Sequence, residues 1–307
     1  MRRALLILLA VLCLSSCKPS YQSDSRFLFD TVCTITAEGS KDISSAWDAL
    51  YDLERRISAT VDGSEICQIR DSAGKAWVQV SEDTYQMLLL AQELSSLTDG
   101  AFDVTVEPVS KLWAFGNESQ HKPADSEIEE KLRLVGYKGL LLKSEEGLYW
   151  ARLEREGMAL SLGAIGKGYA ADLAARILKE LGIKSALLDF GGNIYCLGSY
   201  DGNPWRIGLQ DPSQPRGSYE RVVEAVNKSV VTSGVYERSF TENGVLYHHI
   251  LDARTGWPSS YEYRAVSIIG ESSMICDGLS TACFLLGEQK AKNLLAYFEG
   301  YEAIFLE

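Results

Sequence analysis

The sequence predicts an α+β fold, with helices packed on mixed, mostly antiparallel sheets in two closely associated lobes. Segments with helical periodicity are interspersed with short strands, and some strands are separated by tight turns such as Glu145-Glu146-Gly147. Such hairpins favour antiparallel pairing over the doubly wound parallel sheet that a regular alternation of strands and helices would build. The chain has no internal repeat and no heptad run.

Residues 1–16 form a predicted targeting segment that precedes the fold. Two arginines are followed by an apolar run from Ala4 to Leu14, which is shorter than the ~20 residues that a membrane-spanning helix needs. The run ends in Leu14-Ser15-Ser16-Cys17, which resembles a bacterial lipobox. We therefore expect cleavage before Cys17 and a lipid on its thiol; cleavage of an ordinary signal peptide nearby is the alternative.

Cleavage at this position would leave 291 of the 307 residues. Residues 17–25 would serve as a polar tether, and residues 26–307 would form a single domain with a sizeable core. The lipid would hold the exported chain on a membrane. We expect a periplasmic protein that its lipid anchors to the bacterial inner membrane.

Apolar residues spaced by three or four positions predict helices in the first half of the domain, and polar caps mark their beginnings. A strand over 27–37 comes first. Ser40 would cap the next element, a helix whose apolar face is Ile43, Trp47, Leu50, Leu53 and Ile57. Ser81 would cap a second helix that ends at Asp99-Gly100. A short helix then runs from Asp125 or Ser126 to Val135.

The second half of the domain is richer in strands. The expected elements are strands over 140–162, an alanine-rich helix over 167–181, a buried strand over 186–190, several short strands over 193–269, helices over 276–286 and 289–297, and a final strand over 303–306.

The charge of the chain argues against a nucleic-acid partner. The formal net charge is −12, and it becomes −14 when Arg2 and Arg3 are removed. Binding to nucleic acid depends on cations that neutralise phosphates, so we expect none here. The five cysteines after Cys17 have no CxxC spacing. They are expected to be buried apolar residues, with at most one disulfide, rather than zinc ligands.

Three glycine-containing segments could contact a ligand, and each also has a purely structural explanation. Residues 100–108, followed by Trp113 and Phe115, place an acid beside aromatic rings, which suits a planar ligand or a corner of the core. Residues 161–169 join a strand to a helix whose amides and Lys167 suit a phosphate, although a packing turn would look the same. Residues 189–193 end a strand in two glycines, as a close approach to a ligand or a tight hairpin requires.

The spacing of Asp277 and Thr281 places a carboxylate and a hydroxyl on one face of a helix. Oxygen donors of this kind suit Mg²⁺, which keeps positions open for water and substrate phosphates. A capping acid and a threonine bonded to its own helix are the structural alternative. The glycine spacing nearby is neither a P-loop nor a dinucleotide fingerprint, which argues against a nicotinamide oxidoreductase.

Two of the three histidines, His248 and His249, are adjacent. Neighbouring residues on a strand point to opposite faces, so at most one of them can face a site and the other is structural. An imidazole has an ordinary pKa of about 6.5 and is therefore suited to proton transfer.

These segments, in this order, resemble the ApbE family of FAD:protein FMN transferases. The resemblance covers nearly the whole chain after Cys17. The matching segments are Phe29-Asp30-Thr31, residues 58–64, 100–105, 162–168 and 189–193, Thr232-Ser233-Gly234, and residues 249–256 and 277–281. The resemblance implies an ApbE-like α+β fold.

The resemblance also implies an activity. Members of the family cleave the pyrophosphate of FAD with Mg²⁺, attach FMN to a threonine of an exported flavoprotein, such as a subunit of an Rnf- or Nqr-type redox pump, and release AMP. Some members hydrolyse FAD to FMN and AMP instead. The alternative is a periplasmic lipoprotein that binds or scavenges flavin without catalysis, which would need the ring pocket but not the metal ligands.

Site residues follow from the same resemblance. The carbonyl of Ala164 and the side chains of Asp277, Ser280 and Thr281 would hold Mg²⁺. His249 would be the catalytic base, helped by Asp252 or, through a bound water, by Asp277. The residues that would contact FAD are Phe29, Thr60, Ala101, Phe102, Asp103, Ser161, Lys167 and the backbone of Ile250.

The chain departs from the family pattern at several of these positions. Ser161 stands where an aspartate is common, Thr60 where a tyrosine is common, and Phe29 where a methionine is usual. The turn after His249 reads Leu251-Asp252-Ala253. Because Thr60 lacks an aromatic ring, we expect weaker FAD binding than in relatives with the tyrosine.

Overall fold

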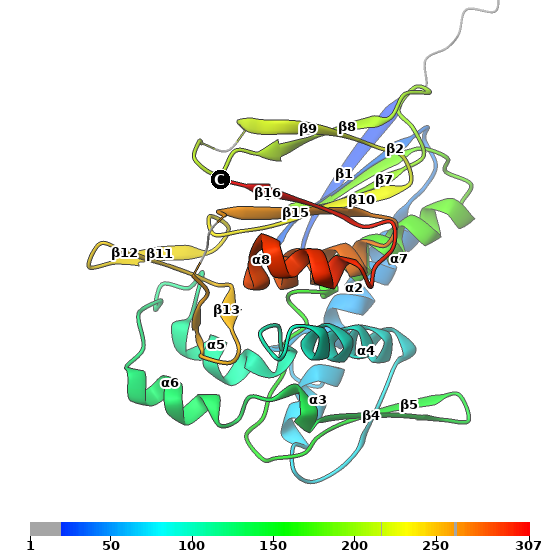
Figure 1. Cartoon of the computed structure of the whole chain (residues 1–307). Helices are drawn as coiled ribbons and strands as arrows, with labels where there is room; N and C mark the ends of the chain where they lie inside the picture. The colour runs from blue at the N-terminus through cyan, green and yellow to red at the C-terminus, as the bar shows by residue number, and fades with distance from the viewer. Residues whose placement is uncertain (1–19, 216, 261–262) are drawn as a thin grey trace, which may run out of the picture.

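A seven-stranded antiparallel sheet forms the centre of the protein (Figure 1). In this computed structural model, residues 20–215, 217–260 and 263–307 are described. The strand order across the sheet is β1 (Tyr21–Leu28), β2 (Thr31–Glu38), β6 (Ala186–Phe190), β7 (Asn193–Leu197), β10 (Lys228–Gly234), β15 (Ala265–Gly270) and β16 (Glu302–Leu306). The predicted α+β class, with mostly antiparallel sheets, is confirmed.

Three long helices cover one face of this sheet, and a β-hairpin covers the other (Figure 1). The helices are α2 (Ser44–Ile57), α7 (Gly166–Glu180) and α8 (Ser273–Leu295), and the hairpin is β8 (Trp205–Gln210) and β9 (Tyr219–Ala225). The main core lies between the sheet and the helices, and a second apolar cluster lies beneath the hairpin.

The remaining elements lie below the helices in Figure 1. Helix α4 (Glu82–Leu97) packs against α8 and carries the three-stranded sheet β3-β5-β4. The other elements are α3 (Glu65–Asp71), β3 (Val78–Val80), η1 (Val104–Val106), α5 (Glu107–Trp113), α6 (Asp125–Leu132), η2 (Tyr137–Gly139), β4 (Leu140–Glu145), β5 (Leu148–Leu153), β11 (Ser239–Glu242), β12 (Val245–His248), β13 (Leu251–Asp252) and β14 (Trp257–Pro258). None of the helices in the described residues is long and apolar enough to cross a membrane.

Helices α7 and α8 cap each other. The carboxylate of Asp172 on α7 accepts hydrogen bonds from the amides of Ser273 and Met274, at 2.8 and 3.0 Å, in the first turn of α8. The carboxylate of Asp277 on α8 accepts the amide of Gly168, at 2.9 Å, in the first turn of α7. Each helix therefore supplies an anion to the positive N-terminal end of the other, where backbone amides have no partner within their own helix.

The approach of the two helices depends on Gly168. A Cβ atom at this position would lie 2.3 Å from the carbonyl oxygen of Ser273 and 2.7 Å from the Cα of Met274. These are backbone atoms, which cannot rotate away as a side chain can. The alanines expected to allow close packing, including Ala170, Ala171 and Ala174, are all buried on α7.

Several sequence expectations need correction at the N-terminal end of the domain. The strand expected over 27–37 is a hairpin, because Phe29 and Asp30 adopt φ values of 53° and 58° and turn the chain back. The tether expected over 17–25 is too long, because residues from Tyr21 onward pair with β2; Cys17 itself and residues 1–16 lie outside the described residues. Ser40 is not the cap of α2: Ile43 occupies the cap position, and Asp42 accepts the amide of Ser44.

Other differences are smaller. The strands expected over 140–162 end at Leu153. Helices α3 and α5 were not expected, because each has only seven residues and too few apolar positions to show a period. The two helices expected over 276–286 and 289–297 are confirmed as the two parts of α8, which are separated at Gly287, where φ is 70° and ψ is 164°; only the outer ends differ, at Ser273 and Leu295. Ser81 caps α4 as predicted, by accepting the amide of Thr84.

The five cysteines in the described part of the chain are all buried and free, as expected for apolar residues, and no disulfide joins them. Burial raises the pKa of the Cys33, Cys196 and Cys283 thiols to about 12. These thiols therefore stay protonated and unreactive at neutral pH.

The close contact at Gly168 predicts a stability difference between two glycine substitutions. Gly168→Ala should lower the free energy of unfolding by about 1–3 kcal/mol or more, because the new methyl group meets backbone. Gly163→Ala is the matched control, since its Cβ would meet only the Ser161 hydroxyl, at 3.5 Å. Chemical denaturation of both variants tests the point, and equal midpoints would contradict it.

Candidate active site

Three of the candidate metal ligands lie within one turn of α8, and the hydroxyls of two of them, Ser280 and Thr281, face β10. Asp277 is 4% exposed and lies one helical turn before Thr281. The hydroxyl of Ser280 donates to the carbonyl of Asp277 at 2.8 Å. Ser233, on β10, lies within hydrogen-bond distance of both hydroxyls, at 2.7 Å from that of Ser280 and 3.1 Å from that of Thr281.

This donor set fits a hard divalent cation. It offers one buried carboxylate and neighbouring hydroxyls, all of them oxygen atoms, which Mg²⁺ prefers. One oxygen of Asp277 accepts the amide of Gly168, so the second oxygen of the carboxylate is the one suited to an ion. In the described residues no three His, Cys, Asp or Glu side chains lie close enough together to bind one metal ion. A metal ion at Asp277 would therefore need other oxygen ligands as well.

The segment that leads into α7 passes beside this carboxylate. Ala164 is partly buried against the main core, and Lys167 and Ser161 are half-buried. The Lys167 ammonium lies 3.4 Å from the carbonyl oxygen of Gly163. The Ser161 hydroxyl accepts the amide of Gly163 at 3.3 Å.

The amides of this segment are less available to a phosphate than the sequence suggests. The amide of Gly166 donates to Leu162, and that of Gly168 donates to Asp277. A phosphate bound here would therefore rely chiefly on the charge of Lys167. The buried Asp277, which binds α7, takes the place at the helix N-terminus that an anionic ligand would otherwise occupy.

His249 directly follows β12 and is held by Arg238, the residue that directly precedes β11. Its amide and its Nδ1 both bond to the carbonyl of Arg238, at 3.0 and 3.2 Å. A carbonyl can only accept, so Nδ1 carries the proton and Nε2 of the neutral ring has the free lone pair. Burial chiefly, with smaller contributions from the charges of Arg238 and Lys167, lowers the pKa of His249 to about 4. The ring is thus neutral at neutral pH, with an unprotonated Nε2.

Asp252 was expected to orient His249, with Asp277 sharing the role of base through a bound water as the alternative, and the structure gives Asp252 another role. Its carboxylate bonds to the amide and the guanidinium of Arg254, at distances from 2.5 to 3.2 Å. The histidine is oriented instead by the backbone of Arg238. The sequence did not indicate this contact, because the two residues are eleven positions apart: Arg238 directly precedes β11 and His249 directly follows β12.

His248 has structural contacts, as expected for one of the two histidines from strand alternation and for His248 from the resemblance. It is 1% exposed, its Nε2 lies 3.1 Å from the carbonyl of Ser259, and its ring meets Phe284 edge-on. The amide of Ile250 donates to its Nδ1 at 3.3 Å. The backbone of Ile250, expected to approach FAD, therefore already has its amide bonded within the protein, and its carbonyl accepts the amide of Ser259.

Phe29 lies at the tip of the β1–β2 hairpin in a strained conformation. Two successive non-glycine residues with positive φ cost about 1–3 kcal/mol each, and such strain persists only where the surroundings hold it. The amide of Phe29 donates to the Glu54 carboxylate at 2.6 Å. Asp30 pairs with Arg238 at 3.8 Å. The tip is thus tied both to α2 and to the residue that holds His249.

The segment Ala101-Phe102-Asp103, which was expected to contact one edge of FAD, is almost fully buried within the protein. The three residues are at most 6% exposed. The Asp103 carboxylate accepts the amide and hydroxyl of Thr105 and the amide of Tyr137, at 2.6–2.8 Å. Burial raises the pKa of Asp103 despite these bonds. In this structure Asp103 acts as the cap of η1, which corresponds to the structural alternative.

Thr60 and the turn at Thr255-Gly256 make contacts of their own, separate from those of Asp277 and His249. Thr60 is exposed after α2, and its amide bonds to the Ser58 hydroxyl at 3.2 Å. Gly256, in the turn, has φ 76°, and its carbonyl accepts the indole of Trp113 at 3.0 Å. The turn therefore packs a cluster of aromatic rings rather than contributing donors to the site.

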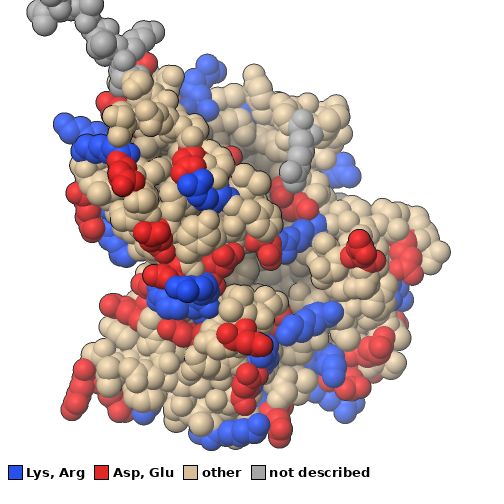
Figure 2. All heavy atoms as spheres, turned by 180° about the vertical axis from the view of Figure 1, so that it is seen from behind, with Lys and Arg blue, Asp and Glu red and all other residues tan. Residues whose placement is uncertain are grey.

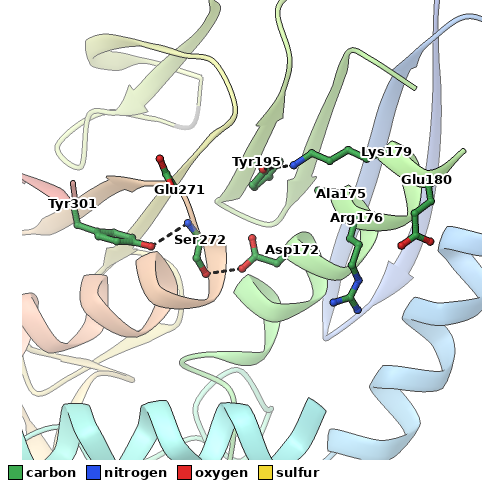
Figure 3. A pocket seen from close by; sticks show the side chains of 9 residues that line it. All are labelled: Asp172, Ala175, Arg176, Lys179, Glu180, Tyr195, Glu271, Ser272 and Tyr301. Atoms are coloured by element: carbon green, nitrogen blue, oxygen red, sulfur yellow. Dashed lines mark hydrogen bonds between the residues drawn. The ribbon is translucent and has the colours of Figure 1, made fainter. Parts of the chain in front are cut away.

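A cavity in the described chain lies away from these residues. It measures about 450 Å³ and is lined by the C-terminal half of α7, Tyr195 and the start of α8 (Figure 3). The Asp172 cap and Tyr301 converge there on Ser272. None of the expected ligands line it. Seen from behind, the surface is also hollowed between the upper and lower parts of the molecule, with side chains of both charges along the rim (Figure 2).

Three contributors to the site were not among the residues expected to act. Ser233 entered the sequence analysis only as part of the matching segment Thr232-Ser233-Gly234. Its contact with Thr281 forms because β10 packs against α8. Glu54 and Arg238 carried no signal at all, because their partners lie 25 and 11 positions away on other elements.

Comparison with known proteins shows which family the chain resembles. The sequence model described as the ApbE family matches residues 29–305. A Treponema pallidum protein named FAD:protein FMN transferase is 32% identical, over 98% of this chain and 90% of its own length. A Klebsiella pneumoniae protein of the same name is 35% identical, over 79% and 75%.

Solved structures show the same likeness. The crystal structure of the ApbE protein from Thermotoga maritima has a TM-score of 0.83 and 32% identity, and the match covers 93% of this chain and 94% of that one. The Pseudomonas stutzeri flavinyl transferase ApbE has a TM-score of 0.80 and 26% identity, with 95% and 92% covered.

The environment of His249 predicts its titration. The ring should gain a proton only near pH 4, well below the ordinary value of 6.5. Between these values the unfolded chain binds the proton first, so the stability contributed by His249 is lost as the pH falls from about 6.5 to 4. NMR titration of the imidazole signals, assigned with His249→Gln, measures this; a midpoint near 6.5 would contradict the burial argument.

Proposed function

The chain belongs to the ApbE family, and on that premise we propose that it is an FAD:protein FMN transferase. The observation that carries the proposal is that the chain holds both a buried carboxylate, Asp277, one helical turn before the Thr281 hydroxyl, and a neutral histidine, His249, whose Nδ1 is bonded and whose Nε2 is unprotonated. A protein that only binds flavin needs neither. The names of the most similar relatives support the same activity.

The substrate would be FAD and the acceptor a threonine hydroxyl of another exported flavoprotein. The threonine oxygen attacks the FMN-side phosphorus, a new O–P bond forms, and the P–O bond to AMP breaks. The hydroxyl proton passes to Nε2 of His249. A threonine hydroxyl is a weak nucleophile, so a positioned base contributes about 10²–10⁴-fold to the rate. Water in place of threonine would give FMN and AMP, which is the pyrophosphatase side reaction.

The residues that would hold Mg²⁺ are Asp277, Thr281 and Ser280, with the carbonyl of Ala164. When bound, the ion would neutralise pyrophosphate charge and act as a Lewis acid. Lys167 adds a positive charge on the neighbouring helix. The reciprocal caps of α7 and α8 fix this lysine relative to Asp277, because Gly168, next to Lys167, bonds directly to that carboxylate. Phosphoryl chemistry depends mainly on such positioning and charge.

The proposal extends to location. Leu14-Ser15-Ser16-Cys17 supports lipidation at Cys17, which would anchor the protein to the periplasmic face of the inner membrane. The acceptors would then be periplasmic domains of membrane or membrane-bound flavoproteins, of which the Rnf- and Nqr-type subunits are the family's examples.

One assay separates this proposal from a flavin-binding protein. The purified chain is incubated with FAD and Mg²⁺, with and without a peptide that contains an acceptor threonine, and AMP is measured. AMP that rises with the peptide, together with FMN bound to it, supports the transferase. AMP in neither tube, with FAD still bound, favours the binding protein.

Two substitutions should separate the contribution of the catalytic base from that of the metal ion. His249→Gln should lower transfer by about 10²-fold or more while FAD affinity is kept, because the base is lost and the pocket is not. Asp277→Asn should abolish the dependence on Mg²⁺, while its amide oxygen can still accept Gly168 and hold α7. His121→Gln, in an exposed loop, is the matched control. Full transfer activity in His249→Gln would remove the base assignment.

Thr60 offers a test on affinity. Thr60→Tyr should tighten FAD binding by about 2- to 12-fold, the equivalent of 0.5–1.5 kcal/mol from one aromatic stacking contact. Thr60→Val controls for loss of the hydroxyl without adding a ring. Unchanged equilibrium binding of FAD in Thr60→Tyr, measured by fluorescence, would show that the position does not contact the ligand.

A further inference from the structure

The end of the sheet where β1 begins carries a cluster of aromatic rings that is partly exposed. The ring of Tyr21 lies 4.7 Å from that of Tyr200 and 5.7 Å from that of Trp205. Tyr200 and Trp205 are 5.0 Å apart. Trp205 is 7% exposed, whereas Tyr200 is 46% exposed. The buried tryptophan therefore supports a tyrosine that faces solvent.

Val226 extends the same surface. It is 40% exposed and directly follows Ala225, the strand partner of Trp205. We call Tyr21, Tyr200, Trp205 and Val226 the entry cluster. The cluster is rigidly joined to the sheet, because the Tyr21 hydroxyl bonds to that of Ser185 at 2.9 Å and the amide of Gly39 bonds to the carbonyl of Ser20.

The charges around the entry cluster are mixed. Lys41 and Lys184 are exposed at this end of the molecule, and so are Asp42 and Asp201. These four charges include both signs, so they create no strong positive or negative potential at this end. The feature that sets this surface apart from its charged surroundings is therefore its partly exposed aromatic rings. Tyrosine and tryptophan, with an apolar body and a polar tip, are the residues enriched where a protein meets lipid headgroups.

The length of chain that precedes β1 determines what this surface meets. Cys17 is only four residues before Tyr21, and four residues span at most roughly 14 Å even when fully extended. A lipid on Cys17 would thus hold Tyr21, and the rings in contact with it, within that distance of the membrane. A longer tether would have left the orientation of the domain open.

We propose that the entry cluster rests on the lipid surface and sets the orientation of the domain on the membrane. The proposal rests on the proposed lipidation of Cys17. In this orientation β1 leads away from the anchor: its eight residues cover about 27 Å, and the Phe29 tip that is tied to Arg238 lies at its far end.

The consequence concerns the acceptor. Twelve residues separate Cys17 from Phe29, so the hairpin tip cannot lie more than roughly 40 Å from the lipid surface. An acceptor threonine therefore has to reach the protein within this distance of the lipid surface. A flavoprotein domain that is itself held at the same membrane meets this requirement, and transfer to it should be faster than transfer to the same domain free in solution.

Hydrogen–deuterium exchange tests the contact directly. The mature lipoprotein in phosphatidylcholine vesicles is compared with the soluble Cys17→Ala chain. Amides of residues 199–203 and 226–228 should exchange at least several-fold more slowly on vesicles. Intact mass reports whether Cys17 carries lipid, so a failure of lipidation is seen separately. In that event a hexahistidine segment in place of residues 1–17, bound to nickel-chelating lipids, provides the tether.

Matched variants assign the effect to the cluster. The double variant Tyr200→Ser/Val226→Ser should lose the protection, whereas Tyr219→Ser should keep it. Tyr219 is 63% exposed and lies at the opposite end of β9, about 20 Å from Ala225. Equal exchange on vesicles and in solution would overturn the proposal. Protection that appears in the soluble chain as its concentration rises would overturn it too, because a second copy would then cover the surface.

Discussion

The reciprocal capping of α7 and α8 is the interaction on which the rest of the site depends. Asp172 binds the first amides of α8, and Asp277 binds an amide in the first turn of α7. Hydrogen bonds to a charged acceptor contribute about 1.5–3 kcal/mol each when buried. Neither cap can form unless the helices touch, and they can touch only because residue 168 has no side chain. One contact thereby fixes the metal-binding candidates on α8 relative to Lys167 on α7.

The same arrangement gives Asp277 two tasks. One carboxylate oxygen holds α7, and the other is suited to a cation, so the fold and the proposed chemistry share a single side chain. Asp172 has only the structural task, and burial raises its pKa although three donors favour its charge. Two buried acids on adjoining helices are therefore not equivalent: Asp277 is followed, within one helical turn, by Ser280 and Thr281, whose hydroxyls contact Ser233.

A second chain of contacts joins elements that are distant in sequence. Glu54 holds the amide of Phe29 in its strained turn, Asp30 pairs with Arg238, and the carbonyl of Arg238 holds His249. Gly191 lets the neighbouring β6–β7 turn approach, since a Cβ there would lie 2.3 Å from the Thr31 hydroxyl. Phe29 and His249, which are 220 positions apart in the sequence, are thus linked through Asp30 and Arg238, although the exposed ion pair between them is long.

Local patterns in the sequence predict the α+β class and the positions of the long helices, because periodicity and caps are local properties. The helical spacing of Asp277 and Thr281 and the strand alternation of the two histidines are local too, whereas the choice of His249 and the rest of the candidate site came from the resemblance to the ApbE family. The tertiary structure decided what these residues do. The hairpin at Phe29, the carbonyl that orients His249, the local use of Asp103 and Asp252, and the second role of Asp277 all depend on partners from other elements. Contacts of this kind leave no pattern along the chain, because each is set by how the sheet and helices pack together.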